Sequence, residues 1–362
     1  MTFLGIPLYF SYLAKHYLKN IAVILFGLSL IFSVIDYFQH APKLAKLGTY
    51  QLYYIFYKWE EALTILYPLA IVFAVIVTKM MMVKSSNFVV LHAFGYTQKK
   101  LFMPFLVVSL SVYAIFMFLH TTEFSYAKDK AQHLLENEYG HYQVQDLFFK
   151  YNDAFVYVKK LDPVKKRIED ITLFKVEGNQ VRYTIKAPYA LFDGEGWDAK
   201  NAVLKSHIYH NDTLQRFERV ERESIRTLEG YRPKIMESLY EGKSLSVIDA
   251  FQTWQLFNKQ SLDSKKVRAT IYDKIVSPLF AIAMLLILFF KLPFHARMSN
   301  LSTVLVASIG STITIWGILY GLGRIGYNGV VLPEVSTVLP IFVLALYSIY
   351  IYLYSEAKSL SK

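Results

Sequence analysis

Six long runs without a charged residue set the strongest constraint on this chain. A helix that crosses the hydrocarbon core of a bilayer needs about 20 apolar residues, with a range of roughly 17–25. Flanking Tyr, His and Lys side chains can extend the shorter runs by reaching toward the interface. The sequence therefore predicts six transmembrane helices, over Asn20–Ile35, Ala62–Thr78, Leu101–His120, Ile275–Phe290, Met298–Gly323 and Val335–Ser355.

The first run could alternatively belong to a signal peptide. Asp36, Tyr37, Phe38 and Gln39 follow it directly, and these are not the small residues of a cleavage site. We therefore favour six spans over five.

The positive charge of the chain lies in its apolar part. Formal net charge is +11, yet residues 121–272 hold 24 Lys+Arg against 22 Asp+Glu, and the remainder holds 15 against 6. This distribution fits loops at an anionic membrane surface and disfavours a nucleic-acid-binding domain. The chain has no cysteine, which excludes disulfides and thiolate metal sites.

Basic residues in short loops predict the orientation, because they are enriched on the cytoplasmic side. One side would carry ten of them: Lys15, Lys19, Lys79, Lys84, Lys99, Lys100, Lys291, Arg297, Lys358 and Lys362. The other side would carry four: Lys43, Lys46, Lys58 and Arg324. Both termini are therefore predicted in the cytoplasm of a bacterium, with the long central segment in the periplasm.

That central segment changes from helical to strand periodicity. Alternating strands are predicted over residues 154–160, 171–176, 181–186 and 202–209, with turn residues at 177–180 and 193–196. Strands at this spacing predict an antiparallel sandwich or jelly roll. A helix is expected over Ser244–Asn258. The predicted domains are helices 1–3 in residues 1–125, a periplasmic β domain in 126–270, and helices 4–6 in 271–362.

Catalytic and cofactor motifs give no support for an enzyme. Gly321, Gly323 and Gly326 match G-x-G-x-x-G, but they follow an apolar helix, whereas a dinucleotide site follows a strand. The ionisable residues Asp36, Asp273 and Glu334 lie only at the edges of the predicted spans. Self-powered transport needs such groups at membrane depth. We therefore expect a non-catalytic protein without cofactor or metal, driven by energy from elsewhere.

The segment Lys84–Lys100 predicts a short helix between the second and third spans. Ser85 or Ser86 would cap its start and Gly95 would end it, giving about nine residues and about 13 Å. Phe88, Leu91 and His92 share one face. Such a helix either lies on lipid or docks into a groove on an ATPase as a coupling helix, and the pattern alone leaves both open.

Several motifs, in order along the whole chain, resemble the LptF/LptG lipopolysaccharide-export permeases. The segment Lys84-Ser-Ser-Asn-Phe-Val-Val-Leu-His-Ala-Phe-Gly-Tyr-Thr97 resembles the loop between their second and third spans, and its ending is more similar to LptG. Lys274-Ile-Val-Ser-Pro-Leu279 and Leu292-Pro-Phe294 resemble the start and end of their fourth span. Ala187–Trp197 resembles the signature of their periplasmic domain.

The resemblance implies a set of partners. An LptB-type ATPase dimer would dock beneath two permease halves, this chain and the other one (LptF if this is LptG). LptC would add a helix and a periplasmic domain, and an LptA bridge would carry lipopolysaccharide, taken from the inner membrane, toward the outer membrane.

The resemblance also implies site residues. The ATPase-coupling helix would present Ser86, Asn87, Phe88, Leu91, His92 and Gly95, and Asn87 stands where the family often has a Glu that pairs with the ATPase. His40, Lys43 and Lys46 would contact lipid phosphate; lysines that merely anchor a span to anionic lipid are the alternative, and Pro42 would break a helical grouping. Ala307, Ser308, Ser311 and Thr312, in a span rich in small residues, would line a lateral gate against the other half.

Two other functions remain open from the residues. One is a permease of another lipid or lipoprotein export system, which usually has four spans. The other is a membrane-anchored periplasmic binding or sensor protein, which needs no ATPase.

Overall fold

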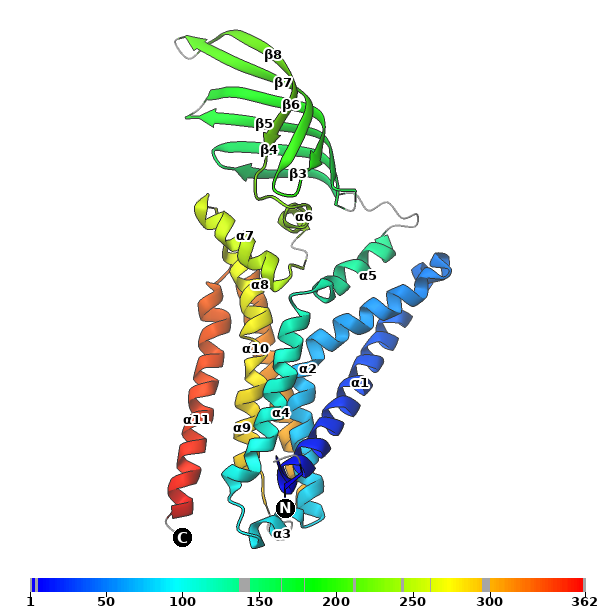
Figure 1. The fold of residues 1–362 in the computed structure, drawn as a ribbon, viewed down its shortest axis with the longest axis vertical. Coiled ribbons are helices and arrows are strands. Elements are labelled where there is room, and N and C mark those ends of the chain that lie inside the picture. The colour runs from blue at the N-terminus through cyan, green and yellow to red at the C-terminus, as the bar shows by residue number, and fades with distance from the viewer. Residues whose placement is uncertain are drawn as a thin grey trace. The chain divides into compact units, whose positions relative to one another are not determined.

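The computed structural model describes residues 2–3, 6–136, 144–163, 165–178, 180–210, 213–241, 244–260, 262–294 and 300–360. The chain divides into a helical unit, residues 1–131 with 268–362, and a β unit, residues 132–267 (Figure 1). The β unit is thus inserted between two halves of the helical unit. The predicted membrane protein with an inserted antiparallel β domain is confirmed.

The helical unit has six segments long and apolar enough to cross a membrane. They are formed by α1 (Leu8–Leu44), α2 (Tyr50–Lys84), α4 (Gln98–Leu119), α8 with α9 (Lys265–Ile275 and Leu279–Lys291), α10 (Leu301–Tyr327) and η4 with α11 (Glu334–Val338 and Leu339–Leu360). Shorter elements are β1 (Thr2–Phe3), β2 (Ile6–Pro7), η1 (Ala45–Leu47), α3 (Asn87–Ala93), η2 (Glu123–Tyr126) and α5 (Ala127–Glu136). Arg297, Lys362 and Met298, used in the orientation count and the fifth predicted span, lie outside the described residues.

The helical unit has two distinct ends. At one end lie α3, the N-terminal part of the chain and the C-terminal end of α11. At the other end lies η1 (Figure 1). We call these the α3 end and the η1 end. α1 continues through Pro42 and ends two residues later at Leu44, followed by the tighter turn of η1. The expected break at Pro42 therefore comes slightly after the proline.

Proline divides the fourth span into α8 and α9. Pro278 lies between them, and its missing N–H and bulky ring prevent a continuous helix. The N–H of Leu279, which would bond to the Ile275 carbonyl in a continuous helix, donates instead to the Val276 carbonyl at 3.0 Å. The Ile275 carbonyl accepts a hydrogen bond from the Tyr113 hydroxyl of α4, at 2.9 Å. A side chain of α4 thus supplies the hydrogen bond that the break in the fourth span removes.

The β unit is one antiparallel sheet with strands in sequence order. The strands are β3 (Val144–Tyr151), β4 (Ala154–Asp162), β5 (Arg167–Glu177), β6 (Gln180–Phe192), β7 (Trp197–His210) and β8 (Thr213–Thr227). The helix α6 (Pro233–Glu241) adds Ile235 and Met236 to the core on one face. Trp197 is fully buried there, and its Nε1 donates to the Tyr231 carbonyl at 2.6 Å. The predicted helix after the strands is α7 (Val247–Lys259), capped by Ser246.

Candidate functional site

The short helix α3 ends as its sequence predicts. Gly95 adopts a left-handed conformation, with φ of +81°, just beyond the end of the helix. Its N–H donates to the His92 carbonyl at 2.9 Å, and the N–H of Tyr96 donates to the Leu91 carbonyl at 3.2 Å. This pair of bonds is the Schellman motif, which satisfies carbonyls that the last turn leaves without a donor.

The predicted cap at the start of α3 is wrong. Ser86 is itself left-handed, with φ of 60°, and its side chain accepts no N–H of the helix. Ser85 instead donates from Oγ to the Met81 carbonyl at 3.0 Å and so belongs to the end of α2. Only two residues separate the helices, so one must finish α2 while the other turns the chain. Asn87 donates from Nδ2 to the Tyr12 hydroxyl of α1 at 3.0 Å.

Phe88 packs inside its own chain. Its side chain is 0% exposed and meets the rings of Phe294 and Phe289 edge to face, at 5.4 and 6.3 Å between centroids. His92 packs on Phe294 as well, at 5.6 Å. The interpretation that Phe88 enters a pocket on another protein therefore needs correction. Phe88 instead anchors α3 to its own helical bundle through this packing.

The opposite face of α3 is exposed and apolar. Val90 and Phe94, four residues apart, are 51% and 76% exposed, and Val89 is also exposed. Residues at this spacing lie side by side on a helix. Of the predicted set, Leu91 and His92 are half-buried. Val90 and Phe94 therefore form the part of α3 that another surface can cover.

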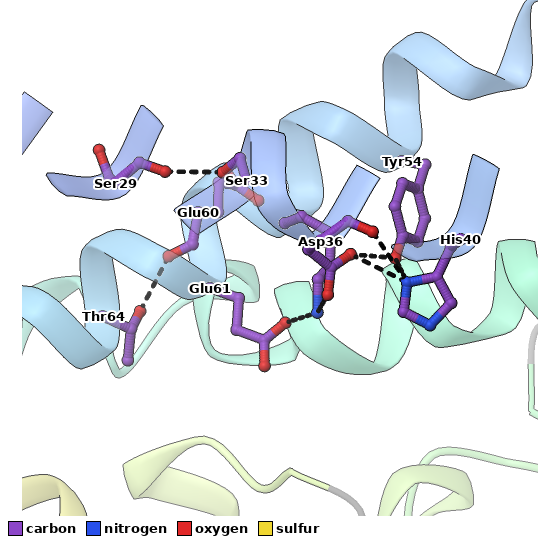
Figure 2. Close-up of polar contacts among 9 residues, drawn as sticks. Ser29, Ser33, Asp36, His40, Tyr54, Glu60, Glu61 and Thr64 are labelled. Carbon is purple, nitrogen blue, oxygen red and sulfur yellow. Dashed lines mark hydrogen bonds and ion pairs between the residues drawn. The ribbon is translucent and has the colours of Figure 1, made fainter. Parts of the chain in front are cut away.

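A polar cluster joins α1 to α2 near the η1 end (Figure 2). Asp36 of α1 pairs with Lys58 of α2 at 3.0 Å and accepts a short hydrogen bond from the Tyr54 hydroxyl. Lys58 also pairs with Glu61 at 2.7 Å. These three charged side chains are only 12–15% exposed. The cluster holds two acidic groups around one ammonium, and it connects the two helices directly.

The cluster separates the three predicted phosphate-binding residues. His40 turns toward it, with Nδ1 at 3.4 Å from Asp36 Oδ2 (Figure 2). Lys43 and Lys46 remain exposed beyond it, in the last turn of α1 and in η1. Lys58, counted among the loop lysines in the sequence, is instead a half-buried member of the cluster. Of the three predicted phosphate-binding residues, Lys43 and Lys46 are therefore the two with exposed side chains.

The four predicted gate residues divide between two faces of α10. Ser308 and Thr312 are 6% and 0% exposed and face the helices of this chain. Ala307 and Ser311 are exposed. The exposed small residues recur at spacings of three and four along one side of α10: Thr303, Ala307, Gly310, Thr314, Gly317 and Gly321. A face of small residues allows another helix to approach closely in lipid.

Comparison with known families gives one match over nearly the whole chain. The model of the lipopolysaccharide export system permease LptF/LptG matches residues 11–354. The chain belongs to the LptF/LptG permease family. No curated protein matches it.

The sequence of this permease predicted α3 and the exposed lysines but missed the polar cluster. Asp36 and Lys58 lie at the edges of apolar runs, where a single charge is unremarkable. A pairing signal did exist, because Lys58 and Glu61 stand three residues apart on one helix face. The contact with Asp36 crosses from one helix to another, and no local pattern encodes it.

We expect Lys58→Met to destabilise this permease. The change leaves Asp36 and Glu61 close together without their cation, at a cost of about 1–3 kcal/mol for desolvated, unpaired groups. Lys43→Met, at an exposed position, is the control and should change stability by less than about 0.5 kcal/mol. Thermal unfolding of both variants in detergent measures the difference. Equal melting temperatures would show that the cluster does not hold α1 to α2.

Proposed function

We propose that this chain is one permease half of an ABC transporter that takes lipopolysaccharide from the bacterial inner membrane and passes it to a periplasmic bridge. Family membership carries this proposal. The energy would come from a separate ATPase of the LptB type, and an LptA-type bridge and LptC would complete the path. The six apolar segments and the inserted β unit are the parts such a role requires.

The α3 end is proposed to face the cytoplasm. The basic residues Lys84, Lys99 and Lys100 border α3, in keeping with the enrichment of Lys and Arg in cytoplasmic loops. Both chain termini lie at this end (Figure 1). Lys79 does not contribute to the surface charge, because it is 0% exposed. The β unit would then lie in the periplasm.

Cysteine labelling tests this orientation, because the chain has no native cysteine. Ser85 and Glu218 are both exposed, one at the α3 end and one in β8. In intact spheroplasts an impermeant maleimide should label Glu218→Cys and not Ser85→Cys. After the membrane is opened, both should react. Labelling of Ser85→Cys in intact spheroplasts would contradict the orientation.

α3 is proposed to dock on the ATPase through its exposed face. Phe88 fixes the helix to the bundle from one side, and this leaves Val90 and Phe94 to fill an apolar groove on the other. Asn87 already donates to Tyr12, so the usual acidic contact of the family is replaced here by apolar ones.

Phe94→Asp should weaken binding of the ATPase by about tenfold to a hundredfold. Burying a side chain of this size contributes about 1.5–3 kcal/mol, and tenfold corresponds to 1.4 kcal/mol. Gln98→Asp adds the same charge at an exposed position four residues on and should bind normally. Co-purification and titration of the ATPase measure the effect. Normal binding by Phe94→Asp would mean that α3 lies on lipid.

Lys43 and Lys46 are proposed to contact the phosphates of the lipid at the η1 end. An ammonium–phosphate contact is charge-assisted, and these two side chains are exposed where the outer headgroups would lie. His40 is proposed to orient the end of α1 through Asp36, since it faces the cluster.

Lys43→Glu and Lys46→Glu should each reduce crosslinking to lipopolysaccharide by about fivefold, from a contact worth about 1 kcal/mol. Lys128→Glu, at an exposed position where α5 begins, is the matched control. Photo-crosslinking of the lipid to purified complex measures all three. Equal losses in the three variants would indicate general attraction to an anionic surface.

The other permease half is proposed to pack against the exposed small residues of α10, including Ala307 and Ser311. Ser308 and Thr312 would lie behind that face, buried against their own bundle, and their hydroxyls donate to carbonyls of α10 itself.

A further inference from the structure

Lys79 lies near the α3 end of α2 with a side chain that is 0% exposed. Within the part of the chain that the structure describes, no carboxylate pairs with it. Its Nζ instead donates to two backbone carbonyls at the end of α9, those of Phe289 and Leu292, the second at 2.7 Å. A buried ammonium is retained only where other groups compensate its lost hydration.

The carbonyl of Phe289 lacks a backbone donor because a proline stands at the position that would supply one. In a continuing helix its partner would be the N–H four residues later, and that residue is Pro293, which has none. The ammonium of Lys79 stands in for the missing N–H. It also lies at the negative end of the α9 dipole, which favours a cation.

Two aromatic rings surround the same ammonium. Nζ lies 3.6 Å from the ring centroid of Phe294 and 4.8 Å from that of Phe289. Cation–π attraction adds to the compensation of its charge. Phe88 of α3 packs on these same two rings. Three elements therefore meet at one point: the end of α2, the short helix α3 and the end of α9.

The joint connects parts of the chain that are distant in sequence. Lys79 and Phe289 are 210 residues apart, and the whole β unit lies between them. A force on α3 has a covalent route into α2, through the turn at Ser85 and Ser86. Its direct route into α9, which belongs to the first span of the second half of the helical unit, runs through Phe88, Phe294 and Lys79.

We propose that Lys79 is a positioning residue that fastens α9 to α2 and α3, so that a displacement of α3 moves both halves of this chain's helical unit together. This inference rests on the proposed function. Without the ammonium, the end of α9 loses its attachment to α2, and only the Phe88 packing would transmit the motion.

The test is the amount of lipopolysaccharide moved per ATP hydrolysed by the full complex in liposomes. Lys79→Met keeps the length of the side chain and removes its charge and donor. Pro293→Ala supplies the backbone N–H that reaches the Phe289 carbonyl when Leu292 takes helical backbone angles in place of its extended ones. The double variant Lys79→Met/Pro293→Ala therefore offers the Phe289 carbonyl a backbone donor while it leaves α9 unattached to α2. Lys84→Met, at an exposed position on the same helix, is the control.

We expect the double variant to assemble with the ATPase and hydrolyse ATP, with lipid moved per ATP at least fivefold below the wild type. Pro293→Ala alone and Lys84→Met should stay within about twofold of it. A double variant that couples normally would overturn the proposal, because Lys79 would then only complete a helix. Failure of the double variant to assemble would also overturn it, in favour of a purely structural role. A wild-type complex that hydrolyses ATP and moves no lipopolysaccharide would overturn the proposed function itself, and this inference with it.

Discussion

Backbone carbonyls without a helical donor organise the membrane part of this permease. In a bilayer there is no water to satisfy them, so the protein must supply each donor itself. The need arises twice in the fourth span, once at the break between α8 and α9 and once at the end of α9, before Pro293. Tyr113 of α4 answers it at Ile275, and Lys79 of α2 answers it at Phe289. The end of α8 and the end of α9 are thus each held by a helix of the first half, and this joins the two halves of the helical unit.

A second kind of close fit joins α10 to the element after it. A Cβ on Gly326 would collide with the side chain of Ser336, so glycine permits this close approach of α10 to η4. The same six-residue pattern, Gly321 to Gly326, resembled a nucleotide-binding motif in the sequence. Its position inside a helix that packs on η4 explains the last glycine without any ligand.

Polar side chains hold the other end of the first two helices. Asp36, Lys58 and Glu61 form one network across α1 and α2, and the exposed lysines lie just beyond it. Holding α1 and α2 in register there would keep Lys43 and Lys46 at a constant depth. At the α3 end, Phe88 packs on two aromatic rings and Lys79 donates to two backbone carbonyls. These contacts hold α3 and α9 to the bundle. The proposed lipid contact and the proposed ATPase contact are therefore each carried by a rigid support.

The sequence by itself determined the six spans, the inserted strands and the end of α3 at Gly95, because hydropathy, alternation and backbone freedom are local properties. It also indicated which loops are basic. Only the tertiary structure decided that Phe88 is an internal anchor, that Lys58 is an ion-pair partner and that Lys79 is buried. Each of these depends on a contact between different helices, and the residues of such a contact are tens to hundreds of positions apart. A single sequence shows which side chains are charged or aromatic, but packing alone selects the ones that meet.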